Sequence, residues 1–499
     1  MPAKIDDPAP FVNLMKPALD RATALLGGTD AMRAAGTDFL PKFPGEHQEV
    51  YNWRLKVAVL NNFYDAMAAQ MVGKLFEKPL TWVRQSKIDK AILDNIDKRG
   101  SSLDTFAGEL AKALLTKGRP HILIDHPKKP EEAQTAADDQ AHGLRPYWVQ
   151  LEPGCVISAW ADTESGEERL GYFSWREWAN KLDGYGIKSL ERIRIFKRNE
   201  AGQIEFEVWE RERDTDQFEL AEQGELRPGG SGAMKEIPLV TLYSDRQSFM
   251  VAKPTLDDIA HKNIEHWQSS ADQRHILTVS RFPILYQFGT KNPVALVGPY
   301  SMFHADASKQ DAEIGYAEAE GKGTEHGWKD LDRILKEAES MAIRIMISDA
   351  AKTDAGEKTD WAKEGSRLQK LAFEVERAIN QALIHTARWQ GLPDEAAGVV
   401  QTNKDFGISS DDAKAIEQLL AMREKGDLSQ PTLWREAIER RLFRTKFDPK
   451  KEAELIEDEK QRNLEAAMAA GFGGAGPGAE DDDDEGEGAP PKKPAAAAA

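Results

Sequence analysis

The chain has 499 residues, 40% of them hydrophobic and 30% charged, which is typical of a globular protein with a large core. Its net charge of −18 argues against tight, general binding of nucleic acid, because Lys and Arg supply most of that affinity. No apolar run approaches the ~18–20 residues needed to cross a bilayer, and residues 1–15 lack a signal-peptide pattern, so we expect a cytoplasmic protein.

Two helices are predicted in the first quarter of the chain. Residues 50–77 carry apolar side chains at steps of three and four, and Pro79 prevents much further extension. A second helix is predicted over residues 102–117, where Ser102 can cap the start and Gly118 ends the pattern.

A short buried strand is predicted at residues 122–124, a β-branched-rich run bounded by prolines. His121, Asp125 and His126 flank it and could ligate zinc, although His142 is the only other histidine nearby. Polar residues at the end of a strand are the simpler interpretation, and we favour it over a metal site.

Residues 146–245 predict mainly β structure. Short alternating segments recur there, with turns at residues 199–202 and 228–232. The glycine-rich stretch 227–234 lacks the GK[ST] ending of a P-loop, so we interpret it as the tip of a hairpin.

A long helix is predicted over residues 255–280, with Thr255 as its N-cap and two aspartates in its first turn. One stripe along it is too polar for the core of a single chain, so we expect this stripe to pack on copies of itself or to line water. The stripe consists of Leu256, Ile259, Asn263, His266, Ser270 and Gln273.

The following segment, residues 281–325, predicts an irregular module rich in proline, glycine and aromatic residues. Strands are expected at residues 283–288 and 313–320. Exposed acids and aromatics suit a small module that contacts a partner.

Two more long helices are predicted over residues 326–348 and 361–390. The polar stretch DAAKTDAGEKTD, residues 349–360, separates them. The first helix has a heptad-like seam of Trp328, Leu331, Leu335, Ala338, Ala342 and Ile345. The second has a stripe of Leu368, Leu371, Val375, Ile379, Leu383 and Thr386.

Smaller helices are predicted over residues 411–425, 431–443 and 449–469. Beyond them the chain becomes acidic and low in complexity. That tail cannot bury enough apolar surface to offset the entropy of ordering it, so it is expected to be disordered.

The sequence carries no signature of a catalytic site. Walker A, HExxH, GxSxG and paired CxxC motifs are all absent. Cys155 is the only cysteine, which excludes disulfides within the chain and zinc sites built from cysteines, and we interpret it as a small buried hydrophobe. We therefore expect no enzyme, no cofactor and no metal.

Five segments, taken together, carry a resemblance. They are AGTDFLPKFPGEHQEVYNWRLKVAVLNNF with GKLFEKP (35–63 and 73–79), LLTKGRPHILIDHP (114–127), LDDIAHKNIEHWQSSADQRHILTVSRFPILYQFG (256–289), LDRILKEAESMAIRIMIS (331–348) and NKDFGISSDDAKAIEQLLAMREKGDLSQPTLWREAIERR (403–441). In this order they resemble the portal proteins of tailed bacteriophages, in the group carried as an uncharacterised domain in phage and prophage genomes. The resemblance covers residues 30–445.

The resemblance implies an α+β portal fold with named parts. These are a wing (1–253), a first stem helix (254–280), a clip (281–325), a second stem helix (326–348), a tunnel loop (349–360), a long wing helix (361–394) and a crown (395–470), with the acidic tail (471–499) outside the match.

It also implies a function. About twelve copies would form a ring at one capsid vertex, and double-stranded DNA would be packaged, and later ejected, through its channel. The expected partners are the terminase large subunit, head-completion, adaptor and tail proteins, and the major capsid and scaffolding proteins, with no membrane involved. The protein would be assembled in the host bacterial cytoplasm and reside in the virion.

Particular residues receive roles through this resemblance. The tunnel loop would present Asp349, Lys352, Thr353, Asp354, Glu357, Lys358 and Asp360 to the DNA. The channel face of the stem would carry Lys262, His266 and Arg274. The clip would meet its partners through Tyr300, Phe303, Asp306, Lys309, Asp311 and Glu313. In the loop, acids offset the lysines, so DNA should slide past rather than stick.

Two alternatives stay open. One is another structural or adaptor protein of the virion, although a helical scaffold fits poorly with the β-rich region 146–245. The other is an enzyme that uses carboxylates and a metal, which rests only on the excess of acidic residues.

Overall fold

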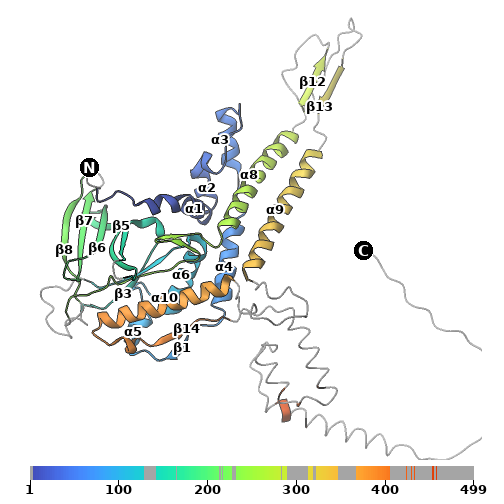
Figure 1. Cartoon of the computed structure of the whole chain (residues 1–499). Helices are drawn as coiled ribbons and strands as arrows, with labels where there is room; N and C mark the ends of the chain where they lie inside the picture. Colours follow the sequence, from blue (N-terminus) through green and yellow to red (C-terminus); the bar gives the residue numbers. More distant parts are fainter. Residues whose placement is uncertain are drawn as a thin grey trace, which may run out of the picture. The chain divides into compact units, whose positions relative to one another are not determined.

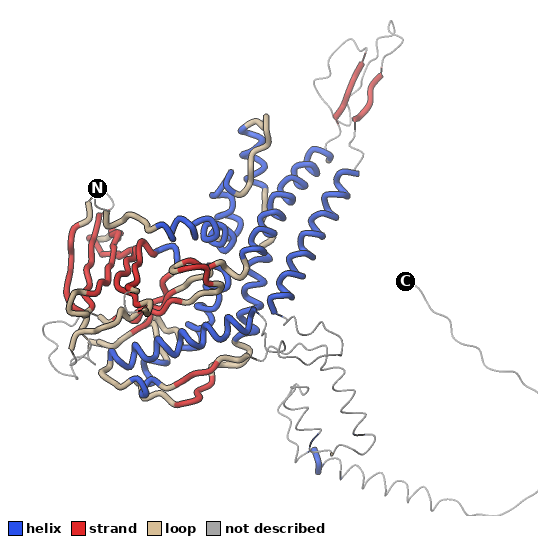
Figure 2. Tube along the Cα trace, in the orientation of Figure 1, coloured by secondary structure: helices blue, strands red, loops and turns tan. Residues whose placement is uncertain are grey.

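The described part of the chain falls into two units, Met1–Gly407 and Ile408–Ala499. A computed structural model describes residues 4–127, 142–163, 166–212, 215, 217–227, 232–281, 284–288, 313–317, 322–346 and 367–404, and the isolated positions 423, 429, 432, 452–454 and 457. The helices predicted over 411–425, 431–443 and 449–469 fall in the second unit, where only those positions are described, and they stay predictions. The first unit has a mixed α and β fold (Figure 1, Figure 2).

Four helices begin the chain, and the structure corrects the predicted helix over 50–77. The helices are α1 (Pro10–Leu26), α2 (Gly28–Ala35), α3 (Gln48–Val57) and α4 (Phe63–Leu75). Ala58 is extended, which ends α3, and the Asn62 side chain caps α4 by accepting from the Asp65 N–H. The predicted helix is therefore two helices, and α1 and α2 were not predicted.

The next helix and strand match their predictions. The hydroxyl of Ser102 caps α6 (Leu103–Lys117), and Gly118 ends it in the left-handed conformation. A short helix, α5 (Lys90–Leu93), comes before it. Strand β2 (His121–Asp125) is buried along its whole length.

Strand β2 is the middle strand of a three-stranded antiparallel sheet. Its neighbours are β3 (Tyr147–Leu151) and β9 (Leu239–Thr241). Trp148 on β3 donates its indole N–H to Thr386, and Trp389 donates to the backbone oxygen of Ile124. Both acceptors are buried, so these bonds fix the sheet against the helix that carries Thr386 and Trp389.

That helix is α10 (Arg367–Trp389), and it lies across the unit beside the sheet (Figure 1). All six residues of its predicted stripe are buried, which confirms the prediction for this helix. A 3-10 turn, Asp394–Ala397, and strand β14 (Val399–Gln401) follow it, and β14 pairs with β1 (Thr81–Arg84).

A five-stranded antiparallel sheet confirms the β-rich region and adds strands that the sequence analysis did not single out. In spatial order its strands are β4 (Val156–Asp162), β5 (Arg169–Asp183), β6 (Gly186–Arg198), β7 (Ile204–Glu212) and β8 (Glu219–Glu225). One face packs on the main core through Phe173, Trp175 and Phe196, and the other holds a small cluster of Ile157, Ile193 and Ile195. Two short strands, β10 (Arg246–Ser248) and β11 (Val251–Ala252), come next in the chain.

Two long helices, α8 (Asp257–Ser280) and α9 (Lys322–Met346), complete the unit. Strands β12 (Ile284–Phe288) and β13 (Glu313–Ala317) lie between them in the chain and pair antiparallel, so the two predicted strands are present. No helix in the described ranges combines the length and apolar character that a membrane span requires.

The candidate zinc ligands His121 and Asp125 instead form hydrogen bonds with nearby side chains. His121 shares a hydrogen bond with the Thr241 hydroxyl, and Asp125 accepts from Arg194 at 2.7 Å and from the Tyr147 hydroxyl. Within the described ranges, no three potential metal ligands gather at one point.

Burial raises the pKa of the Cys155 thiol to about 12, which keeps it protonated.

Replacement of Gly118 should destabilise the fold. Gly118 has φ 80°, and a Cβ there would lie 3.0 Å from the backbone nitrogen of Pro254. We expect Gly118→Ala to lower the free energy of unfolding by about 1–2 kcal/mol in urea titration. Gly73→Ala is the matched control: it lies in α4 with open space around it and should raise stability by about 0.5–1 kcal/mol. A neutral Gly118→Ala would contradict the strain argument.

Candidate functional site on the α8–α9 helix pair

Helices α8 and α9 lie side by side and antiparallel (Figure 1). Lys262 pairs with Glu337 at 2.8 Å, and further along α8 Gln273 donates to the backbone oxygen of Thr324 at 2.7 Å. Residue numbers therefore rise along one helix while they fall along the other. Each helix is about 36 Å long at 1.5 Å per residue, so the pair is a long two-helix element.

The chain order defines the two ends of this pair. Strand β12 follows the end of α8, and β13 comes just before the start of α9, so the two-stranded ladder belongs to one end. The other end joins the rest of the unit. There Asp257, in the first turn of α8, pairs with Arg21 of α1 at 2.7 Å.

Helix α9 is strongly two-sided. Its buried side consists of Leu331, Ile334, Ala338, Ala342 and Ile345. The predicted seam is therefore right at four positions, and its fifth member, Leu335, is half-buried against the core. It is wrong at Trp328, which is 52% exposed, and it omits Ile334. Next to Trp328, the two helices approach closely at Gly327, where Gln273 of α8 fills the space that a side chain would need.

The polar stripe of α8 is buried inside the single chain, which corrects the expectation that it was too polar for a core. The Asn263 side chain accepts from the Tyr64 N–H and donates to the Asn61 carbonyl, both at 2.9 Å. Gln273 bonds α9, as described above. Asn263 and Gln273 are therefore satisfied by backbone partners within the single chain, whereas Ser270 is half-buried and lies at the surface of the pair.

The three residues predicted for the channel face separate in the structure. His266 is buried with its ring edge-on to Phe63 at 5.7 Å, and burial lowers its pKa, so it does not lie on an exposed face of the unit. Lys262 is half-buried, and its hydrogen bonds to Glu265 and Glu337 raise its pKa. Arg274 is exposed.

A buried arginine attaches α3 to α8. Arg54 pairs with Glu46 at 2.9 Å and with Asp272 of α8 at 3.0 Å, and it donates to the Pro41 carbonyl. The hydrogen bonds from Arg54 lower the pKa of Glu46, whereas burial raises the pKa of Asp272. The phenyl ring of Phe43 covers the guanidinium at 4.3 Å, so most of its surface is out of water.

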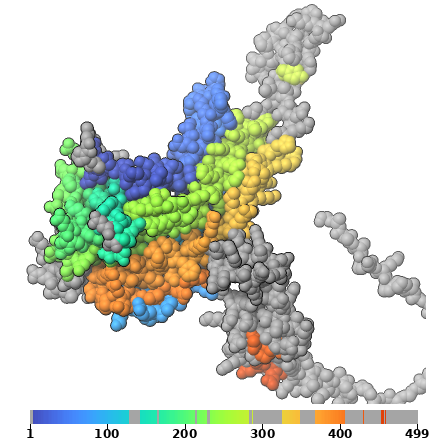
Figure 3. Space-filling model, in the orientation of Figure 1, coloured from blue at the N-terminus to red at the C-terminus, as the bar shows by residue number. Residues whose placement is uncertain are grey.

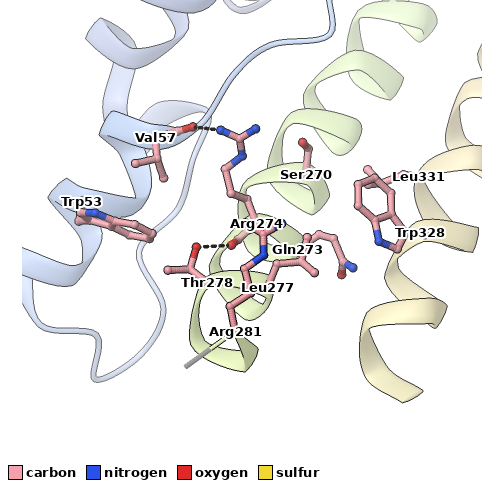
Figure 4. Close-up of a pocket in the computed structure, with 10 residues that line it drawn as sticks. All are labelled: Trp53, Val57, Ser270, Gln273, Arg274, Leu277, Thr278, Arg281, Trp328 and Leu331. Carbon is pink, nitrogen blue, oxygen red and sulfur yellow. Dashed lines mark hydrogen bonds between the residues drawn. The ribbon is translucent and has the colours of Figure 1, made fainter. Parts of the chain in front are cut away.

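A groove of about 410 Å³ crosses α8 between α3 and α9 (Figure 4). Trp53 of α3 and Trp328 of α9 stand on its two sides, and both indoles are partly exposed. Figure 3 shows the surfaces of α3 and α8 next to each other, with α9 beyond. The floor consists of Ser270, Gln273, Arg274, Leu277 and Thr278 of α8 and of Arg281, which directly follows the helix.

The groove holds cations that the described residues do not neutralise. Arg274 donates to the Val57 carbonyl at 3.2 Å, but within the described ranges neither it nor Arg281 forms an ion pair with a carboxylate. Trp and Arg are the side chains most enriched in protein interfaces. The groove is therefore a candidate contact surface, which we call the α3–α8–α9 groove.

No sequence pattern predicts this groove, because its residues come from three separate elements. In the sequence, Trp53 and Trp328 fit the apolar stripes of their helices, and nothing distinguishes Arg281. The predicted tunnel loop 349–360 and the clip residues Tyr300, Phe303, Asp306, Lys309 and Asp311 lie outside the described residues. Glu313 begins β13, where it lies opposite Phe288 in the ladder.

Comparison with known proteins gives one match. A family model described as a domain of unknown function (DUF4055) matches residues 255–390. This span contains the whole of α8, α9 and α10, but it is well under half of the chain. No curated protein matches the chain.

Protonation of His266 should loosen α8. Its folded-state pKa is lowered below 6.5 by burial, so the unfolded chain binds this proton first as the pH falls. We expect the free energy of unfolding to decline as the pH falls through the unfolded-chain pKa near 6.5, and to decline less steeply in His266→Leu. His121 and His385 shift in the same direction and are present in both proteins, so the difference reports His266. Parallel pH profiles would contradict this role.

Removal of the Arg54 guanidinium should be severe. Arg54→Ala leaves Glu46, whose side chain is 4% exposed, as a buried charge without its partner. We expect a loss of about 3–5 kcal/mol in unfolding free energy. Lys56→Ala, at an exposed position on the same helix, serves as the control and should change stability by less than about 0.5 kcal/mol. Equal effects of the two variants would mean that the ion pairs do not hold α3.

Proposed function

We propose that the chain is the subunit of a ring-shaped portal at one vertex of a tailed-phage capsid. About twelve copies would enclose the channel through which terminase packages double-stranded DNA and through which the DNA is later ejected. The ring would also be the platform for joining the head to the tail. The chain itself carries out no chemical step in this proposal.

The antiparallel α8–α9 pair is the observation that carries the proposal. Such pairs, set side by side around an axis, would form the wall of a channel. Their end with the β12–β13 ladder would lie at one rim, and their other end is bonded to α1 and α4. We assign the pair to the stem and residues 281–325 to the clip.

The charges on α9 also favour a channel over a tight DNA-binding surface. The exposed residues include Lys329, Asp332, Arg333, Lys336, Glu339 and Arg344. Over its whole length α9 carries five acidic residues against five lysines and arginines, whereas a strongly basic helix would hold the duplex through counterion release. The same balance of Lys352 and Lys358 against four acids underlies the proposed tunnel loop.

The remaining assignments follow from the body of the unit. We assign the N-terminal helices, the two larger sheets and α10 to the wing, and residues 395–470 to the crown. A five-stranded sheet supports a portal more than a helical scaffold. The proposed partners are the terminase, adaptor, tail, capsid and scaffolding proteins, and the proposed location is the virion.

Purified protein should assemble into rings. Twelve copies of the 55.6 kDa chain give a particle of about 670 kDa. We expect this mass by mass photometry, and end-on views with a central hole by negative-stain electron microscopy. Small closed oligomers without a hole, at protein concentrations where other portals would be assembled, would contradict the proposal.

A further inference from the structure

The β5–β6 hairpin extends beyond the rest of its sheet. Strand β4 pairs with β5 only as far as Trp175, and β7 pairs with β6 only as far as Leu190. The β5–β6 ladder nevertheless continues to the pair of Asp183 and Gly186. Residues 180–189 therefore form a two-stranded ribbon without a third strand, which we call the arm.

The arm exposes an unusual amount of apolar surface. Leu182 and Ile187 lie directly opposite each other and are 82% and 75% exposed. Tyr185 protrudes fully from the turn, where Gly184 has φ 60°, and Trp178 lies on the Leu182 face of β5. A two-stranded ribbon is marginally stable in water alone, and a large exposed apolar patch marks an interaction surface.

The charges of the arm leave one carboxylate unpaired. Lys181 pairs with Glu210 at 3.0 Å and Lys188 pairs with Glu212 at 2.7 Å, both on β7. Within the described residues, Asp183 at the tip has no ion pair. The tip therefore presents a negative charge beside leucine, isoleucine and tyrosine side chains.

The α3–α8–α9 groove has the complementary properties. It is concave where the arm is convex, its sides are the indoles of Trp53 and Trp328, and its floor carries Arg274 and Arg281 without carboxylate partners in the described part. Aromatic walls suit a leucine or tyrosine side chain, and the guanidinium groups suit a carboxylate.

The arm and the groove belong to different sides of the same unit. The strands of the five-stranded sheet and the α8–α9 pair lie on opposite sides in Figure 2. A contact between them therefore joins two copies of the chain. Because it uses two different surfaces, it is head-to-tail, and head-to-tail contacts that close on themselves generate rings.

We propose that the arm of one copy occupies the α3–α8–α9 groove of the next. Asp183 then lies between Arg274 and Arg281, and Leu182 and Tyr185 lie against the two indoles. The inference rests on the proposed ring, since it names the contact by which neighbours recognise each other. The arm is too small to bury the ~1,200 Å² of a stable interface, so it adds to other contacts between neighbours.

Disulfide trapping tests the contact directly. Two proteins are made in a Cys155→Ala background, one with Tyr185→Cys and the other with Ser270→Cys on the groove floor. The expected result is a covalent dimer under mild oxidation only when the two are mixed and assembled. Tyr185→Cys alone should form none, and a dimer of that protein alone would overturn the head-to-tail arrangement.

Charge reversal and its rescue give a second measurement. Asp183→Arg should lower the ring fraction in mass photometry about tenfold or more, and combining it with Arg274→Glu and Arg281→Glu should restore assembly. Glu200→Arg, in the exposed β6–β7 turn, is the matched control and should assemble like the wild type. Circular dichroism checks that each variant is folded.

These experiments distinguish a failure of the arm–groove contact from a failure of the proposed ring. If the wild type forms rings, but mixed proteins do not cross-link and Asp183→Arg assembles normally, the arm contact is wrong and the portal proposal stands. If the wild type forms no ring at any concentration, both fall. Cross-linking with rescue by the charge swap supports the arm in the groove.

Discussion

The buried amide of Asn263 is the contact on which the helix pair depends. It accepts from the Tyr64 N–H of α4 and donates to the Asn61 carbonyl just before α4, and so it satisfies a polar side chain of α8 in the interior. Arg54 makes a second attachment, from α3, through Asp272. With α8 held from two sides, α9 can pack on the remaining face, and the pair keeps a fixed position on the body of the unit.

Most charged side chains of the five-stranded sheet form ion pairs, so the few without a partner stand out as candidates for contacts with another molecule. In the five-stranded sheet, cross-strand pairs such as Arg192 with Glu210 and Arg211 with Glu191 neutralise most cations. Each of these partly exposed ion pairs adds little stability, but together they leave only a few charged side chains of the sheet without a partner. Among the charges without an ion-pair partner in the described part, Asp183 of the arm and Arg274 and Arg281 of the groove lie beside exposed apolar side chains, and that coincidence points to contacts between copies.

The proposed ring links these features. A stem of α8 and α9 needs a rigid attachment, which the buried amides and Arg54 supply, and a ring needs neighbours that recognise each other in one orientation. An arm with an acidic, apolar tip and a groove with arginines and tryptophans give such an orientation, because the reverse arrangement would leave both surfaces unpaired. The α8–α9 pair would then serve both purposes, because it lines the channel and also carries the groove that receives the neighbour's arm.

Several helices and strands could be predicted from the sequence by itself, because capping residues and the spacing of apolar residues determine them locally. The Ser102 cap, the Gly118 end, the buried strand at His121–Asp125 and the stripe of α10 depend on neighbours within one helix or strand, and periodicity reports them. Tertiary structure alone decided the break between α3 and α4, the burial of His266 and the groove beside Trp53. Each of these depends on atoms brought together from distant segments, and a linear pattern of polar and apolar residues does not record which distant backbone groups will satisfy a buried polar side chain.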